Sequence, residues 1–545
     1  SHESQWKSTG DTEVVLRGLQ EWGVSALHHF DGMFAIAFYE SSACRLHLMR
    51  DRLGIKPLYY AYANDGKTLL FASELRALLA SQLVARSLDP ASLSTYLWNG
   101  FVVGPNTIIK DIKLLPQGTT ASIGLENPRV CPETYWELPD QGALDTSPDD
   151  VKQALNESIR NRMISDVPLG VFLSGGVDSS VITAIAAKTS EDSVQTFNIA
   201  FADDNYDESV HAESVAKAIG TEHHRILLTE SMFVNDLESA LASLDQPTFD
   251  GLNTYFVSHA VRNAGLTVAL SGTGGDELFG GYSSFAEVPR VAAMSGRLRW
   301  LPRLFSKGLA STITRLKTGK PGLVPPQMRW GKLDDVFKAG GDLVATFQVS
   351  YALYTMEFMT QLCKHQTVVQ YGLSDIDHWR NKASKSSKLY SISTLELAQY
   401  IGQRLLRDTD STSMAVSLEV RVPLLDHKVV EMVAGLGDQT RFSPLGRKQM
   451  LRDLALSDID PKMFNRPKSG FVLPIDKWCR QSLSSAITEI FEDDDLCRSV
   501  GLEPKAVKAI WQAFNNGSPG IYWSRIWALF ALLWWCRKYD VVLPS

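Results

Sequence analysis

The segment Phe172–Ser180 constrains the fold of this chain more than any other feature. Its sequence, Phe-Leu-Ser-Gly-Gly-Val-Asp-Ser-Ser, lies between an apolar run at 170–173 and a helical pattern at 179–188. Adjacent glycines let a backbone approach a ligand closely, and amide groups at the start of a helix attract anions. The segment lacks the Gly-Lys-Ser/Thr ending of a Walker A loop. It therefore predicts a strand–loop–helix unit that binds phosphate groups by another route.

Asp178 is the one acidic residue in this loop. A carboxylate repels a bare phosphate, so Asp178 is predicted to bind Mg²⁺ or to orient one of the loop's donors. The hydroxyls of Ser174, Ser179 and Ser180 would add hydrogen-bond donors. The alternative is a serine- and glycine-rich turn without a ligand, which the flanking elements and Asp178 together disfavour.

Strands and helices alternate on both sides of the loop. Strands are predicted at 170–173, 194–201, 226–228 and 267–270, and helices at 179–188, 208–219, 232–244 and 253–263. This rhythm is typical of a parallel sheet with helices on both faces. From about residue 290 the chain is predicted to be mostly helical. The predicted fold class of residues 147–545 is therefore α/β, a doubly wound parallel sheet with a largely helical C-terminal part.

The first 140 residues follow another pattern. Strands at 33–39, 45–49, 58–63 and 69–72 are predicted to form an antiparallel meander, with helices at 11–18 and 74–80. Strands between helices predict an αββα layered domain. Residues 137–147 lack periodicity, and Ser147 followed by Pro148 is typical of a helix start. The sequence thus predicts two domains, at 1–140 and 147–545.

Composition restricts the class of protein. The chain has 545 residues, 44% of them hydrophobic and 21% charged, which is typical of globular domains with large cores. Its formal net charge of −7 makes general nucleic-acid binding an unfavourable hypothesis, because phosphate contacts need clustered cations.

Neither the cysteines nor the apolar runs indicate secretion or a membrane span. The six cysteines are scattered without a Cys-x-x-Cys pair, which favours a reducing, cytoplasmic setting. The most apolar run, 526–536, is shorter than the roughly 20 residues that a span needs. It is predicted to be a buried helix, and no membrane partner is expected.

The stretch from Val288 to Leu333 carries ten Lys or Arg residues and no acid. One interpretation is a face that binds an anion or a partner. The other, favoured here, is a solvated surface whose charge is balanced by acids elsewhere.

Further motifs give the chain a family resemblance. Besides the loop at 172–180, which resembles the pyrophosphate loop of ATP pyrophosphatases, the motifs are Ser-Gly-Thr-Gly-Gly-Asp-Glu-Leu-Phe-Gly-Gly-Tyr at 271–282, Ser-Leu-Glu-Val-Arg-Val-Pro-Leu-Leu-Asp at 417–426 and Arg-Pro-Lys-Ser-Gly-Phe at 466–471. In this order they resemble the synthetase domain of glutamine-dependent asparagine synthetase. The segment Arg50–Tyr60 is similar to the glutaminase domain of the same family, an Ntn-hydrolase-like domain.

The resemblance implies an ATP site. The positions that match adenosine-binding residues are Phe172, Ile199, Ser271 and Gly272, and those that match the pyrophosphate cradle are Ser174, Gly175, Gly176, Asp178 and Ser179. On pattern alone, Phe172 and Ile199 are core strand residues, and both interpretations can hold together.

Charged side chains complete the implied site. Asp276, with Asp178, is a candidate Mg²⁺ ligand, and its alternative is a helix N-cap. Lys448 and Lys468 match lysines that face the phosphates, where an ammonium offsets charge as pyrophosphate leaves. A surface charge is the alternative, and it is less probable for Lys468 because of the motif around it.

Two residues bear on the identity of the carboxylate substrate and of the base. Glu419 is a candidate to orient the amine nucleophile or take its proton, and its alternative is an ion pair with Arg421. Thr273 occupies a position where the best-known asparagine synthetases carry a carboxylate. Threonine can donate a hydrogen bond but is no base at neutral pH, so the acceptor or the base is in question.

The glutaminase resemblance is incomplete. In the family the nucleophile is an N-terminal cysteine, whereas residue 1 is Ser, and residues 8–13 already match a stretch well inside the domain. Asp11 matches a carboxylate that binds the amino group of glutamine. The expectation is that the chain as printed does not hydrolyse glutamine.

The resemblance implies a ligase that uses ATP, Mg²⁺, aspartate and glutamine or ammonia to form asparagine, AMP and pyrophosphate through a β-aspartyl-adenylate. The alternatives are a related enzyme that amidates another carboxylate, as in polysaccharide or natural-product biosynthesis, a non-catalytic partner protein, and a nucleic-acid-modifying ATP pyrophosphatase. Homodimers are usual in the family.

Overall fold

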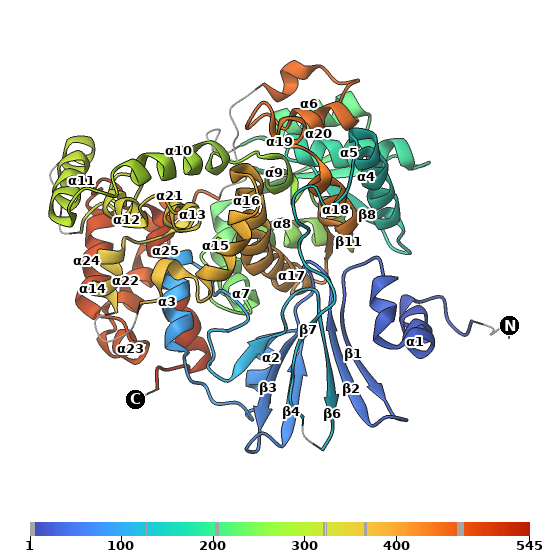
Figure 1. The fold of residues 1–545 in the computed structure, drawn as a ribbon, viewed down its shortest axis with the longest axis horizontal. Helices are drawn as coiled ribbons and strands as arrows, with labels where there is room; N and C mark the ends of the chain where they lie inside the picture. Colours follow the sequence, from blue (N-terminus) through green and yellow to red (C-terminus); the bar gives the residue numbers. More distant parts are fainter. Residues whose placement is uncertain are drawn as a thin grey trace. The chain divides into compact units, whose positions relative to one another are not determined.

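A computed structural model describes residues 6–126, 128–201, 207–319, 322, 324–363, 368–465 and 473–544. The chain forms two compact units. The first comprises residues 1–84 and 113–137, and the second comprises residues 85–112 and 138–545. Figure 1 shows the elements of both units, coloured along the sequence.

The first unit contains two antiparallel sheets. One has the order β1 (Ala35–Glu40), β2 (Arg45–Arg50), β6 (Thr119–Gly124), β7 (Glu133–Thr134), and the other has the order β4 (Thr68–Ala72), β3 (Tyr59–Ala63), β5 (Ile112–Leu114). Leu48 and Ala121 of the first sheet share a buried cluster with Leu58, which precedes β3, and with Tyr60, which lies in β3. Since these side chains come from both sheets, the two sheets face each other.

Helices cover the outer faces of these sheets. Met49, next to Leu48 on β2, points to the opposite face and packs with Leu19 of α1 (Asp11–Trp22). The helix α2 (Leu75–Ala80) contacts β3 and β4. The predicted αββα layering is confirmed.

The predicted single meander is wrong, because β2 and β3 belong to different sheets. The buried carboxylate of Asp51 accepts hydrogen bonds from the backbone N–H groups of Ile55 and Lys56, both at 2.9 Å, and from Phe34 at 3.2 Å. The Arg50 guanidinium donates to the carbonyl oxygens of Gly54, Lys56 and Leu115. These bonds fix a turn that carries the chain from one sheet to the other.

The second unit is built on a five-stranded parallel sheet. Its order is β10 (Glu222–Leu228), β9 (Gln195–Phe201), β8 (Leu169–Phe172), β11 (Val268–Leu270), β12 (Glu419–Arg421). The crossover helices are α5 (Val177–Thr189), α6 (Ser209–Ile219), α7 (Glu230–Ser243) and α8 (Leu252–Asn263). The doubly wound sheet is therefore confirmed. The strand order reverses between β8 and β11, which is where open α/β sheets bind ligands.

The helix α4 (Pro148–Met163) begins as its sequence predicts. Ser147 Oγ accepts a hydrogen bond from the Asp150 N–H at 3.3 Å, and Asp150 Oδ2 accepts one from the Ser147 N–H at 2.8 Å. This reciprocal capping box satisfies two backbone donors at the helix start.

In the described ranges, the rest of the second unit consists of helices and the loops that join them, together with β12. Its helices are α3 (Pro90–Asn99), α9 (Gly275–Phe279), α10 (Ser284–Arg297), α11 (Arg303–Thr318), α12 (Leu333–Ala339), α13 (Leu343–Tyr351), α14 (Met356–Leu362), α15 (Ile376–Ser384), α16 (Lys388–Leu395), η3 (Glu396–Leu405), α17 (Leu406–Met414), α18 (His427–Gly435), α19 (Asp438–Phe442), α20 (Gln449–Ala455), α21 (Ile475–Arg480), α22 (Ser484–Glu492), α23 (Asp494–Ser499), α24 (Pro504–Asn515) and α25 (Trp523–Tyr539).

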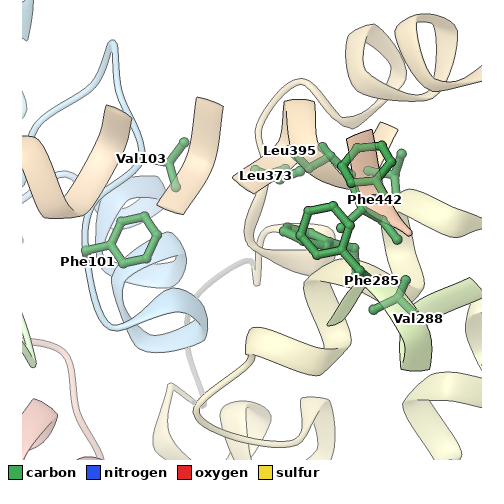
Figure 2. Close-up of a cluster of buried hydrophobic side chains, with 10 residues drawn as sticks. Phe101, Val103, Phe285, Val288, Leu373, Leu395 and Phe442 are labelled. Carbon is green, nitrogen blue, oxygen red and sulfur yellow. The ribbon is translucent and has the colours of Figure 1, made fainter. Parts of the chain in front are cut away.

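A buried cluster explains why residues 85–112 belong to the second unit. Phe101 and Val103 share it with Phe285, Val288 and Phe442, among others (Figure 2). Five large apolar side chains buried together contribute about 1.5–3 kcal/mol each.

The predicted C-terminal helix is confirmed as α25, in which Trp527 and Trp535 are fully buried. In the described part of the chain, no helix has the length and apolar content to cross a membrane.

Candidate active site

A cavity of about 800 Å³ lies in the second unit at the carboxyl ends of β8, β9 and β11. Most of the residues predicted to bind the nucleotide line it. They are Phe172, Ser174, Gly175, Gly176, Asp178, Ser179, Ile199, Ser271, Gly272, Thr273, Asp276 and Lys448. Sequence segments that are far apart along the chain therefore meet in one cavity, at the point where the strand order reverses.

The loop after β8 is shaped by its glycines and serines. Gly175 has φ +74°, and a Cβ there would lie 2.6 Å from the His211 ring, so a side chain does not fit. The Ser174 and Ser179 hydroxyls lie 3.2 Å apart, and the Ser180 hydroxyl donates to the Gly176 carbonyl at 2.7 Å. The loop ends at the start of the thirteen-residue helix α5, whose positive dipole end favours an anion.

The loop after β11 packs closely against the loop after β8. A Cβ on Gly272 would lie 2.8 Å from the Ser179 backbone nitrogen, and one on Gly275 would lie 2.3 Å from the Asp178 carboxylate. Contacts this short need a hydrogen in place of a side chain. The glycines of the 271–282 motif thus let the two loops share one site.

Lys448 connects the two loops. Its ammonium lies 2.7 Å from both carboxylate oxygens of Asp178 and 2.8 Å from Asp276 Oδ1. Burial alone lowers the pKa of Lys448, but the charges of Asp178 and Asp276 outweigh it and raise the pKa above its ordinary value. Lys448 therefore stays charged at neutral pH, and the site holds one cation between two carboxylates.

The carboxylates of Asp178 and Asp276 fit a magnesium ion that is also coordinated by substrate phosphates. Asp178 and Asp276 converge on a single ammonium, so their oxygens are close enough to share one cation. Among the described residues, no group of three or more His, Cys, Asp and Glu side chains could hold a metal alone. Mg²⁺ is usually bound by one or two carboxylates with waters and substrate phosphates.

Glu277 is a cavity residue that the sequence analysis did not select. Its side chain is buried and accepts a hydrogen bond from the Tyr282 hydroxyl at 2.6 Å. Burial, and then the charge of Asp276, raise the pKa of Glu277 to about 8. Its position beside Asp276 in the 271–282 motif was the available signal.

Glu419 lies apart from this arrangement. Its Oε1 accepts a hydrogen bond from Arg421 Nε at 2.7 Å, and Arg421 also binds the carbonyl oxygens of Arg162 and Ile164. Val420, between them on β12, is the residue that lines the cavity. Since strand residues alternate between faces, Glu419 and Arg421 point the other way.

Three other predicted residues have different positions. The Thr273 hydroxyl lies 2.9 Å from that of Ser271 at the cavity wall. Asp11 is the exposed first residue of α1 in the first unit. Lys468 lies outside the described residues.

Comparison with known proteins assigns the family. Residues 150–537 match the asparagine synthase family. This chain belongs to that family. Residues 1–136 match the glutamine amidotransferase domain. Enzymes of the asparagine synthase family use ATP, which agrees with a nucleotide-sized cavity beside the Phe172–Ser180 loop.

Curated relatives match most of the chain. Asparagine synthetase [glutamine-hydrolyzing] 1 of Bacillus subtilis (strain 168) is 28% identical over 90% of this chain and 75% of its own length. Asparagine synthetase [glutamine-hydrolyzing] 3 of the same organism is 28% identical over 86% and 71%. Amidase chyE of Penicillium rubens is 24% identical over 95% and 81%. Among solved structures, NMN synthetase from Francisella tularensis is 20% identical over 25% of this chain and 59% of its own, with a TM-score of 0.19.

Proposed function

We propose that this protein is an asparagine synthetase-type ligase. It joins nitrogen, from ammonia or from glutamine, to the side-chain carboxylate of aspartate and converts ATP to AMP and pyrophosphate. The observation that carries the proposal is the meeting of the Phe172–Ser180 loop, the 271–282 motif and Lys448 in one cavity. Residues 1–140 would be the glutaminase domain and residues 147–545 the synthetase domain, in a reducing compartment.

The first chemical step would form an acyl-adenylate. A carboxylate oxygen attacks the α-phosphorus, and the bond from this phosphorus to the bridging oxygen breaks as pyrophosphate leaves. The Ser174 and Ser179 hydroxyls and the start of α5 would hold the leaving group, and Lys448 would offset its charge. Phe172 and Ile199 would pack against adenosine. Lys468 stays a predicted phosphate contact.

The second step would form the amide. Ammonia attacks the carbonyl carbon of the adenylate and AMP leaves, so the attacking nitrogen must lose a proton. The motif predicts Glu419 as the acceptor of this proton. Because Glu419 is paired with Arg421 and points away from the cavity in this structure, it would have to leave this ion pair and turn toward the cavity to take the proton.

Mg²⁺ would be held by Asp178 and Asp276 together with the phosphates. When bound, this ion offsets the charge that accumulates where two anions meet. Lys448 would then have to release one or both of the two carboxylates that it contacts.

Thr273 supports a second candidate function, amidation of another carboxylate. The Thr273 hydroxyl, which is hydrogen-bonded to that of Ser271, can donate a hydrogen bond to the substrate but cannot take a proton as a base. Asp276 and Glu277 are the acids of this motif, and the raised pKa of Glu277 keeps it neutral at pH 7. A carboxylate substrate that carries its own amine as a base, or that has fewer charges than aspartate, would match this part of the cavity wall.

The test is pyrophosphate release by the whole chain with MgATP, ammonia and aspartate, with the products analysed for asparagine and AMP. Asparagine and AMP in equal amounts would support the main proposal. Binding of MgATP without turnover of aspartate would favour another acceptor, and each candidate carboxylate can be tested by ATP–pyrophosphate exchange. A folded protein that does not bind MgATP would contradict both proposals and indicate a non-catalytic role.

A further inference from the structure

The surface formed by the end of α10, the turn after it and α11 combines exposed apolar and basic side chains. We call it the basic apolar face. Its apolar members are Met294, Trp300, Leu304, Phe305, Leu309 and Leu316, and its basic members are Arg297, Arg299, Arg303 and Arg315. In Figure 1, α10 and α11 lie at the upper left.

The apolar members are unusually exposed. Trp300 is 75% exposed, Leu304 86%, Phe305 70% and Leu316 80%. The helix α11 has sixteen residues and buries only Ser306 and Ala310. Phe305, Leu309 and Leu316 follow one another at spacings that place them on one side of a helix, next to the buried pair. By the same spacing Arg315 flanks this apolar side, whereas Lys307 lies on the opposite side of α11. Several large apolar side chains exposed along one side of a helix mark an interaction surface.

The charge of this face is of one sign. The residues from Val288 to Leu333 include ten Lys or Arg and no acid, although the whole chain has a net charge of −7. An acid of α12 adjoins it, because Asp334 pairs with Arg303 at 2.7 Å and with Lys338 at 3.0 Å. Arg299 and Arg315 are exposed and form no ion pair with any described residue.

The face is held by the core of the second unit. Phe285 and Val288 on the inner side of α10 lie in the buried cluster of Figure 2. Met294 and Arg297 continue the same helix on its exposed side. The core therefore holds the part of the basic apolar face that lies on α10, and α11 is held by its contacts with α12.

We propose that the basic apolar face binds the surface of a membrane that contains anionic phospholipids. A helix with basic residues beside Trp, Phe and Leu lies in the interface of a bilayer, with its apolar side chains among the acyl chains. Lys and Arg contribute through attraction to anionic headgroups. The enzyme would then act at a membrane without crossing it.

Two other occupants agree less well with these observations. In a symmetric dimer through this face, each copy would meet the same basic residues, and like charges would oppose association. A protein partner needs a pocket for each projecting side chain, whereas a bilayer interface accepts Trp300, Leu304 and Phe305 without a complementary shape. The second copy and the acidic protein are outcomes of the experiment.

The experiment is co-sedimentation of the whole chain with vesicles of phosphatidylcholine alone or with about 30% phosphatidylglycerol. We expect binding to the anionic vesicles to be at least about tenfold stronger, and to weaken with salt. Reversing Arg299 and Arg315 together (Arg299→Glu, Arg315→Glu) should weaken it by about 30-fold or more, because each basic residue near the surface contributes about fivefold. The pair Phe305→Ser and Leu316→Ser should weaken binding to both vesicle types.

The matched control reverses two exposed cations elsewhere in the second unit, Lys385→Glu with Lys505→Glu, which changes the net charge equally. This control should retain binding, and melting curves show that each variant is folded. Absence of binding to anionic vesicles, or an equal loss in the control, overturns the proposal. A dimer in solution that Phe305→Ser with Leu316→Ser dissociates also overturns it, as does binding to an acidic protein that vesicles do not displace.

Discussion

The ammonium of Lys448 contacts both carboxylate oxygens of Asp178 at 2.7 Å, although the two residues are 270 positions apart in the sequence. The same ammonium lies 2.8 Å from Asp276. Lys448 has a positive φ of 48°, a conformation that residues other than glycine adopt at a cost of about 1–2 kcal/mol. The surrounding contacts therefore hold this lysine where the two nucleotide loops meet.

Replacing Lys448 by Met should reduce both activity and stability. The variant loses the cation between Asp178 and Asp276, and removing one partner of a buried pair costs about 3 kcal/mol. We expect ATP-dependent pyrophosphate release to fall by at least about 100-fold, since one preorganised charge contributes about this factor. Lys448→Arg is the control, since it keeps the charge. An unchanged melting temperature in Lys448→Met would contradict the ion-pair arrangement.

Gly275→Ala should weaken nucleotide binding without unfolding the protein. The new Cβ would lie 2.3 Å from the Asp178 carboxylate, which must then leave its place beside Lys448. We expect the dissociation constant of MgATP, measured by calorimetry, to rise by at least about tenfold. Gly437→Ala is the matched control, because a Cβ there meets no atom within 4 Å. Equal affinities in the two variants would show that the loops do not need this close approach.

Glu277 should make stability depend on pH. Its pKa is raised from 4.5 to about 8, first by burial and then by Asp276, so the folded protein retains a proton that the unfolded chain loses. The free energy of unfolding therefore falls as pH rises from about 4.5 to 8. Glu277→Gln removes this dependence. The melting temperature of Glu277→Gln minus that of the wild type should increase by a few degrees from pH 5 to pH 9. A difference that stays constant over this pH range would contradict the raised pKa.

Thr273→Val tests whether this hydroxyl contacts the acceptor. The variant keeps the shape of the side chain and loses one neutral hydrogen bond, which is worth about 1 kcal/mol. We expect kcat/KM for the carboxylate acceptor to fall by about fivefold while the KM for ATP is unchanged. If only the KM for ATP changes, Thr273 belongs to the nucleotide part of the cavity instead.

Most of the parallel sheet could be predicted, because β8, β9 and β11 are largely apolar and the apolar end of β10, Ile226–Leu228, marks the fourth strand. The start of β10 could not, since Glu222–Arg225 is polar. β12 could not, since its three residues include Glu419 and Arg421 and only Val420 faces the cavity. A strand this short takes its conformation from its pairing with β11.

The parts of the cavity wall that could be predicted are those whose polar and glycine residues stand together in one short motif. Residues 172–179, 271–274 and Asp276 line the cavity. The partner of Asp178 lies far away in the sequence, and the orientation of Glu419 depends on which face of β12 it occupies. Burial of Glu277 depends likewise on tertiary packing, which no local pattern reports.

The separation of the nucleotide loops along the chain has a consequence for synthesis on the ribosome. β8 and its loop emerge early, the loop after β11 follows, and Lys448 comes last of the three. Until Lys448 has emerged, Asp178 and Asp276 face each other without its ammonium, so a nascent chain would have poor affinity for a polyanion. Nucleotide that is captured only afterwards stabilises the completed unit by mass action. Binding of ATP would thus stabilise fully synthesised, folded molecules and not incomplete ones.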